Sequence, residues 1–104
     1  MMIARWSIDV KFGYKQDALD LMNRWADEIG SQVGWTRERM RLLTGSVGAL
    51  ESTIQSEVQV KDLSELNAAW DKLARIEAHQ RWGKELEAFV VSGTNRWEIF
   101  RVIE

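Results

Sequence analysis

Hydrophobic and polar residues alternate along the first part of the chain, from residue 2 to residue 12, with Ile3 as the one exception. The positions on the apolar side are Met2, Ala4, Trp6, Ile8, Val10 and Phe12. A period of two over this length is typical of a β-strand that buries one face. The pattern predicts a first strand over 2–12, which Gly13 ends.

The period changes to that of a helix between residues 14 and 29. Ala18, Leu21, Met22, Trp25 and Ile29 share one face, and charged residues occupy the others. Gly30 follows, and we expect it to end the helix in a left-handed conformation. The next segment, 31–38, has no clear period and is expected to form a loop around Gly34 and Trp35.

Two further strands are predicted over 39–44 and 51–61. The stretch between them contains Gly45 and Gly48, which is typical of a turn. In the third strand the apolar residues Ile54, Val58 and Val60 share one face with serines. Alternation therefore continues there, although serines occupy some of the positions on the apolar side.

A second helical region follows residues 62–65, which have the spacing of a capping box. Its apolar face moves to nearly the opposite side beyond His79, and one straight helix cannot bury both stripes against one sheet. We therefore expect a break between residues 80 and 83, and a second, shorter helix that ends at Gly93. A last strand is predicted over 96–103.

The order of these elements is β-α-β-β-α-β within 104 residues, which is the size of a single domain, 1–104. Right-handed crossovers place both helical regions on one face of an antiparallel sheet. The predicted fold class is α+β, and the arrangement is ferredoxin-like.

The other face of this sheet has no cover within the chain. The side chains expected there are Arg5, Ser7, Asp9, Arg39, Arg41, Gln55, Glu57 and Gln59. Two interpretations are open: the face contacts water, or two such faces meet across a twofold axis with charges paired between subunits. Six tryptophans in so small a domain favour the homodimer, because exposed aromatic residues often mark interfaces.

Composition and charge exclude several classes of protein. The net charge is −2 without a long basic run, so a nucleic-acid-binding face is not expected. There is no cysteine, which excludes disulfides, thiol chemistry and cysteine-based zinc sites. The N-terminus does not resemble a signal peptide, and no apolar run is long enough to span a bilayer. We expect a cytoplasmic protein.

His79 is the only histidine and therefore the only side chain with an ordinary pKa near neutrality. It is the candidate catalytic residue, as a general base on a small acidic substrate or as a ligand to haem iron. The simpler interpretation is a partly exposed histidine near the helix break. A lone histidine cannot build a zinc site, and we expect no protein-bound metal.

Candidate ligand-binding residues are mainly aromatic. Trp6, Trp25, Trp70 and Trp97 are expected to face the core, where they either fill it or leave irregular space for a ligand. Trp35 and Trp82, in the loop and at the helix break, are expected at the mouth of such a pocket. Arg41 and Glu57 on neighbouring strands either hold a polar substrate group or form a cross-strand ion pair. The predicted ligand-binding set is Trp6, Trp35, Arg41, Glu57, Trp70 and Trp82.

The element order, the helix break and the stretch Met40-Arg41-Leu42-Leu43-Thr44, followed by Gly48 and by Glu57-Val58, carry a family resemblance. The chain resembles the dimeric α+β barrel superfamily, and NIPSNAP-type members in particular. This resemblance implies two ferredoxin-like sheets that pair face to face, with a ligand pocket between each sheet and its helices.

Antibiotic-biosynthesis monooxygenases and haem-degrading enzymes of that superfamily offer a second resemblance. Trp70 and the pair Ala78-His79 are similar to a Trp and an Ala-His pair on their second long helix. The spacing is one residue short of that in the haem degraders. Trp6-Ser7 stands where those enzymes carry an Asn. The resemblance therefore disfavours haem, and we expect no cofactor.

Three functions are consistent with these residues, and whether the protein is an enzyme stays open. The first is a homodimeric barrel protein that binds a small organic molecule between sheet and helices. The alternative is a cofactor-independent monooxygenase acting on an aromatic or polyketide-like substrate, with His79 and a pocket tryptophan. The third is a purely structural dimerisation role.

Overall fold

The computed structural model describes all residues, 1–104, and contains four strands, three α-helices and one short 3-10 helix. In chain order the elements are β1 (Met2–Asp9), α1 (Lys15–Glu28), η1 (Gly30–Val33), β2 (Met40–Thr44), β3 (Thr53–Val60), α2 (Leu63–Leu73), α3 (Glu77–Glu87) and β4 (Arg96–Arg101). The predicted order is confirmed, with the second helical region divided into α2 and α3.

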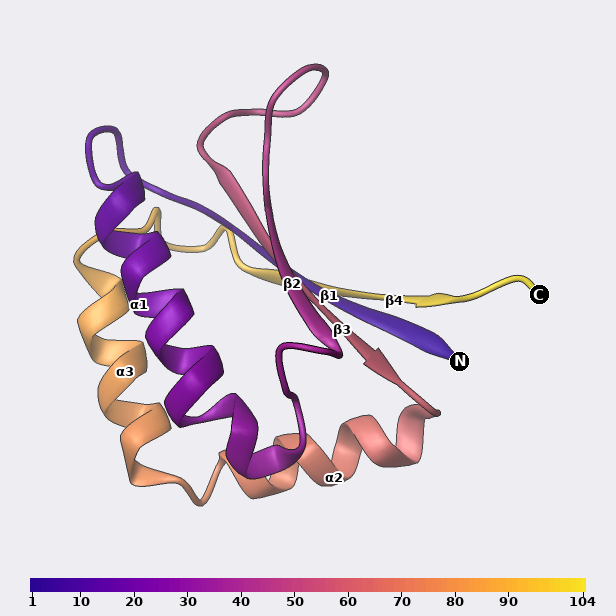
Figure 1. Ribbon diagram of the computed structural model, residues 1–104. Coiled ribbons are helices and arrows are strands. Elements are labelled where there is room, and N and C mark those ends of the chain that lie inside the picture. Colours follow the sequence, from indigo (N-terminus) through magenta and orange to yellow (C-terminus); the bar gives the residue numbers. More distant parts are fainter.

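The four strands form one antiparallel sheet in the order β2-β3-β1-β4. Trp6 in β1 lies opposite Ser56 in β3 and Trp97 in β4, so these three side chains share the face toward the helices. In Figure 1, α1 and α3 lie side by side and α2 crosses below them, all on the same side of the sheet. This is the ferredoxin-like α+β fold that the sequence predicts.

The first strand is shorter than predicted, and Phe12 does not join its buried face. β1 ends at Asp9, which pairs with Thr53 at the start of β3, and only an isolated bridge from Val10 to Val90 follows. Phe12 lies beyond any partner strand and is fully exposed. Alternation in the sequence therefore continues past the end of the sheet.

Gly30 does not end α1 in a left-handed conformation, contrary to the expectation. The left-handed glycine of this connection is Gly34, with φ 78°, which closes η1. Gly30 is required for space instead, because a Cβ there would lie 2.9 Å from the Trp25 ring and 3.0 Å from the Trp35 carbonyl oxygen. Two tryptophans thus approach this glycine from either side.

The helix break lies between Leu73 and Glu77, earlier than the predicted 80–83. Ile76 has an extended backbone there, with φ −90° and ψ 109°. Gly83 is an ordinary residue in the interior of α3, which ends at Glu87, well before Gly93. The break turns the chain so that α3 runs beside α1 while α2 crosses below (Figure 1).

The N-terminus of α2 has the predicted cap. The Asp62 side chain accepts a 2.9 Å hydrogen bond from the Glu65 backbone N–H. Glu65 in turn accepts from the Lys61 backbone N–H and pairs with Arg39. Arg39 thereby connects the start of β2 to the start of α2.

The hydrophobic core between sheet and helices consists of two clusters. One is centred on Ala4, Val58 and Leu66, and the other on Ile8, Ile54 and Met22. Trp82 packs against both clusters. A domain of this size would normally have one continuous core, so the region between the clusters is unusual.

The outer face of the sheet carries a buried carboxylate. Glu57 is 4% exposed, and its carboxylate pairs within the chain with Arg5 at 2.6 Å and Arg41 at 3.0 Å. The cross-strand interpretation of Arg41 and Glu57 is confirmed. These charges are therefore paired inside one subunit, whereas one of the two interpretations of the sequence paired charges of this face between subunits.

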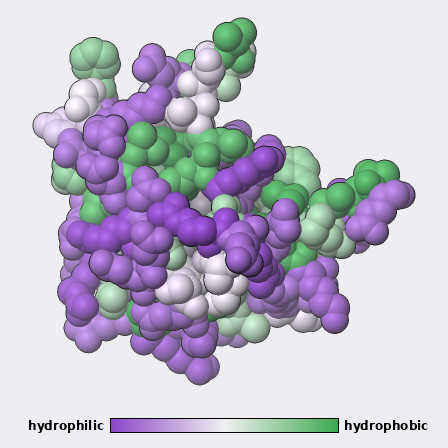
Figure 2. All heavy atoms as spheres, in the orientation of Figure 1, coloured by the Kyte–Doolittle hydropathy of each residue, from purple (hydrophilic) through white to green (hydrophobic).

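Two segments project from the compact body. The β2–β3 connection, residues 45–52, extends at the top of Figure 1, and the chain end beyond β4 extends to the right. Figure 2 shows hydrophobic atoms on both projections, and Val47, Leu50 and Ile103 are largely exposed. None of the helices combines the length and the apolar character needed to cross a membrane.

Candidate ligand-binding cavity

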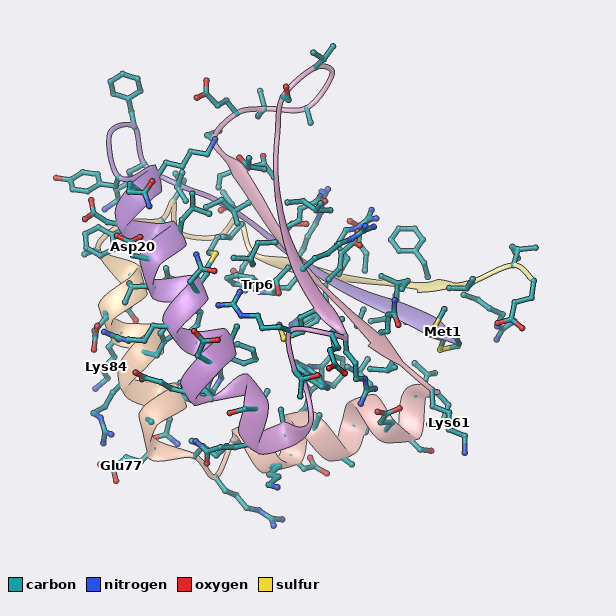
Figure 3. The ribbon with its side chains drawn as sticks, viewed as in Figure 1. Met1, Trp6, Asp20, Lys61, Glu77 and Lys84 are labelled. Atoms are coloured by element: carbon teal, nitrogen blue, oxygen red, sulfur yellow. The ribbon has the colours of Figure 1, made fainter.

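A cavity of about 380 Å³ separates the two core clusters, and all six tryptophans line it. The sheet contributes Trp6 and Trp97, the helices contribute Trp25, Trp70 and Trp82, and the loop after η1 contributes Trp35. Figure 3 shows Trp6 extending from the sheet toward α1. The remaining lining residues are Met22, Ala26, Arg37, Met40, Arg41, Leu42, Ser56, Val58, Leu73, Ala74, His79 and Gly83.

The aromatic rings contact one another in two groups. Trp25 lies about 6 Å, centroid to centroid, from each of Trp35, Trp82 and His79. Trp97 meets Trp35 and Trp70 edge-on at 6.5 and 5.3 Å. Trp35 belongs to both groups and joins them. Such tilted and edge-on contacts stabilise the rings in fixed orientations, so the cavity is preformed.

His79 is held between two tryptophans at the first turn of α3. The Trp25 indole N–H donates to His79 Nδ1 at 2.9 Å, and the Trp82 ring stacks on the imidazole with planes 14° apart. The Trp82 N–H donates in turn to the Leu21 carbonyl at 2.7 Å. Both bonds link α3 to α1.

The hydrogen bond from Trp25 determines which nitrogen of His79 carries the proton. Indole is only a donor, so Nδ1 must be the acceptor and the proton of the neutral ring lies on Nε2. Burial lowers the pKa of His79 below its ordinary 6.5, because the charged form loses solvation. At neutral pH, His79 therefore presents an N–H donor and has no free basic atom.

Two other indole N–H groups have no partner. The Nε1–H groups of Trp35 and Trp70 are buried and donate no hydrogen bond. Trp35 is only 2% exposed as a whole residue. A buried unpaired donor is uncommon in native structures and costs about 1–3 kcal/mol.

The rim of the cavity is formed by the exposed lining residues Arg37, Arg41, Ala74 and Trp97. Arg37 is held by Asp27 and by the side chain and carbonyl of Asn23, all at 3.0 Å. Its hydrogen bond keeps the pKa of Asp27 below the ordinary value. Arg41 donates to Glu57 from Nε alone, so its two terminal nitrogens make no hydrogen bond within the chain.

The structure brings together His79, Trp6, Trp35, Arg41, Trp70 and Trp82 around the cavity, six of the seven predicted site residues. Glu57 lies on the opposite face of the sheet, and the Arg41 guanidinium, which pairs with it at 3.0 Å, lies on that face as well. Burial alone would raise its pKa, but hydrogen bonds from Arg5 and Arg41 hold it below the ordinary 4.5. Its contacts are those of an ion pair within the sheet.

Two positions differ from the expectation of a pocket mouth. Trp35 is almost completely buried, because it packs in the core cluster with Val58 and Leu66. Trp82 is half-buried in the middle of α3, since the helix break lies further upstream. The rim instead carries Trp97, which was assigned to the core and is 41% exposed on the edge strand β4.

The aromatic and charged lining residues that the predicted site did not include are Trp25, Trp97 and Arg37. The two tryptophans lie on the inward-facing sides of α1 and β4, so the periodicity of the sequence correctly predicted that their side chains face the core. Whether inward-facing rings fill a core or surround a cavity depends on tertiary packing. Arg37 lies in a loop without periodicity, and no sequence signal was available for it.

The donor set does not fit iron ligation by His79. Coordination through Nε2 would require the proton on Nδ1, where the Trp25 N–H already occupies the lone pair. No group of three or more His, Asp or Glu side chains converges elsewhere in the chain. Neither haem nor a protein-bound metal is thus suggested by these residues.

No protein-family model matches the sequence, and no curated protein matches it. Solved structures do match the fold. A NIPSNAP family protein from Agrobacterium tumefaciens C58 superposes with a TM-score of 0.78 at 17% identity, over 100% of this chain and 95% of its own. SnoaB from Streptomyces nogalater, a cofactor-independent oxygenase, superposes with a TM-score of 0.70 at 14% identity, over 99% and 93%.

A third similar structure is a dimeric protein of unknown function with a ferredoxin-like fold from Bacteroides fragilis. Its TM-score is 0.59 at 12% identity, over 97% of this chain and 96% of its own. The resemblance to NIPSNAP proteins and antibiotic-biosynthesis monooxygenases is thus confirmed at the level of fold. At these identities, the function has to be argued from the cavity itself.

Proposed function

We propose that this chain binds a small, largely apolar and planar organic molecule in the cavity between its sheet and its helices, and that it works as a homodimer. The observation that carries the proposal is the convergence of all six tryptophans on one cavity of about 380 Å³. This volume falls in the range of small-molecule sites, which are mostly apolar with a few placed polar groups.

The energetics support a ligand over a packing defect. A closed void of 380 Å³ would cost about 9 kcal/mol at ~24 cal/mol per Å³, comparable with the whole stability of a small domain. The exposed rim residues indicate that this cavity opens to solvent, so water can enter it. Water wets an aromatic surface poorly, and an apolar ligand that displaces it gains the hydrophobic free energy.

The homodimer is supported by the edge strand β4. Trp97, Ile99 and Phe100 are each between 37% and 43% exposed there, on both faces of the strand. Apolar groups on an exposed edge strand favour association. The Bacteroides fragilis structure, described as dimeric, shares this fold.

Native mass spectrometry of the freshly purified protein tests both parts. We expect a mass near twice 12.1 kDa, with additional mass from a retained organic molecule. Ala74→Trp is a variant designed to block the cavity, because it places a bulky ring at the exposed rim. It should reduce the retained mass without unfolding the chain. A ligand-free protein that also takes up no planar aromatic compound would contradict the binding function.

The alternative is a cofactor-independent monooxygenase, which the similarity to SnoaB favours. In such a reaction an aromatic CH₂ group would lose a proton, react with O₂ and become a ketone, with water as the second product. The lining side chains include no carboxylate, and His79 is already protonated on Nε2. The donors could stabilise an enolate, but the cavity supplies no base, so binding is preferred.

Oxygen consumption with anthrone distinguishes the two functions. Turnover to anthraquinone that His79→Ala abolishes, with the fold intact, would support catalysis. Binding of the compound without oxygen uptake, in both the wild type and His79→Ala, would support a binding protein.

A further inference from the structure

Gly83 lies in the interior of α3, on the side of the helix that faces the cavity. Leu86, three residues later, is the buried residue of α3, and His79, four residues earlier, lines the cavity together with Gly83. Positions three and four residues apart share one face of a helix. A side chain at position 83 would therefore point into the cavity.

Nothing in the chain itself requires glycine at this position. The backbone of Gly83 does not have the positive φ that favours glycine, unlike that of Gly34. A Cβ on Gly83 would meet no atom within 4 Å, so no neighbour excludes a larger residue, in contrast to Gly30. Glycine also destabilises the interior of a helix relative to alanine. The missing side chain therefore weakens α3 and leaves free space at the cavity wall.

We infer that Gly83 determines the size of the molecule that the cavity accepts, because the ligand occupies the space that a side chain at this position would fill. This inference rests on the proposed binding function and assigns a specificity-determining residue to it. Without a Cβ at this point, a flat molecule can lie directly against the backbone of α3 beside His79.

The competing explanation is that glycine is only tolerated at this half-buried position of α3. The two explanations predict the same effect on folding but different effects on binding. Alanine should stabilise α3 in either case, since its methyl group meets no atom of the protein. The added methyl group weakens binding only if the ligand occupies the same space.

The test compares two flat phenols, 2-naphthol and the larger 1-hydroxypyrene, by equilibrium dialysis against the full chain. The variants Gly83→Ala and Gly83→Leu add a methyl group and a branched apolar side chain at the cavity wall. Lys84→Leu is the matched control, because Lys84 is exposed, does not line the cavity and lies on the outer side of α3 in Figure 3. Thermal unfolding of each variant shows whether a change in affinity follows from a change in stability.

We expect Gly83→Ala to raise the melting temperature and yet to weaken the binding of 1-hydroxypyrene by about five- to tenfold, since the methyl group and the probe overlap. Gly83→Leu should weaken it further, whereas the affinity for 2-naphthol should change by less than about twofold. Lys84→Leu should change neither affinity.

Gly83→Ala decides the question if the leucine variant does not fold. Unchanged affinities in the alanine variant, or an equal loss of affinity for both probes, would overturn the inference and leave the binding function standing. Failure of the wild type to bind either probe would overturn both.

Discussion

At the scale of single residues, the hydrogen bond from Trp25 to His79 in the cavity wall should make the stability of the protein depend on pH. Protonation of His79 places a second donor on Nδ1, opposite the Trp25 N–H, and breaks the bond between α1 and α3. Burial already lowers the pKa of His79 below 6.5, so the folded state binds fewer protons than the unfolded state. Stability is then fully present above pH 6.5 and falls as the pH drops through the lowered pKa.

We therefore expect the free energy of unfolding to decrease as the pH falls below about 6.5, which urea denaturation monitored by circular dichroism can measure. His79→Asn is the matched control, since its side-chain oxygen can accept from Trp25 without titrating. Its profile should be flatter over the same range. Equal acid sensitivity in both proteins would show that other groups dominate. The carboxylates with lowered pKa titrate below about 4.5, outside this window.

A second residue-scale prediction concerns Glu57. Its carboxylate is 4% exposed and accepts hydrogen bonds from both Arg5 and Arg41. Glu57→Gln removes the charge and weakens both bonds, and we expect a loss of about 1–3 kcal/mol in urea denaturation. Glu51→Gln is the comparison, because Glu51 is exposed and lies 4.0 Å from Lys15. Its effect should stay within about 0.5 kcal/mol; equal effects would contradict a stabilising role for Glu57.

At the scale of elements, we expect alanine substitutions at two glycines to change the stability of the protein in opposite directions. Gly30→Ala places a methyl group against the Trp25 ring and the Trp35 carbonyl, and we expect a loss of about 1–3 kcal/mol. Gly83→Ala lies in the interior of α3 with no atom within 4 Å of the added Cβ, and we expect a gain of about 0.5–1 kcal/mol. Thermal unfolding of both variants measures the difference. A stabilising Gly30→Ala would refute the close approach of the two tryptophans.

These glycines also show what the sequence could predict about elements. Periodicity identified every strand and both helical regions, because each buries one face against the same core. It misplaced the helix break, since Ile76 continues the apolar spacing of α2 although its backbone is already extended. Gly83 looks like a helix breaker in the sequence, but it packs without strain in α3. A break without Pro or Gly leaves no local signal.

The cavity could be predicted only in part, for a related reason. Alternation and helical spacing direct Trp6, Trp25, Trp70 and Trp97 inward, and those rings do face the space between sheet and helices. How the rings pack against one another depends on how the helices lie on the sheet, which periodicity does not determine. Trp35 follows η1 in a segment without a periodic pattern, so its burial in the core could not be predicted. The direction of the side chains was thus predictable, while the empty space between them was not.

At the scale of the whole molecule, the proposed homodimer makes a prediction about two phenylalanines. Phe100 is 43% exposed on the outer face of β4, where the Arg5 guanidinium lies 4.8 Å from its ring centre, whereas Phe12 is fully exposed in the β1–α1 turn. If two sheets pair through their outer faces, Phe100 becomes buried and Phe12 stays in solvent. Phe100→Ala should then raise the dimer dissociation constant at least about tenfold, as truncation of a buried aromatic interface residue commonly does. Phe12→Ala should leave it unchanged. Sedimentation equilibrium measures both, and a monomeric wild type, or equal effects of the two substitutions, would contradict pairing through this face.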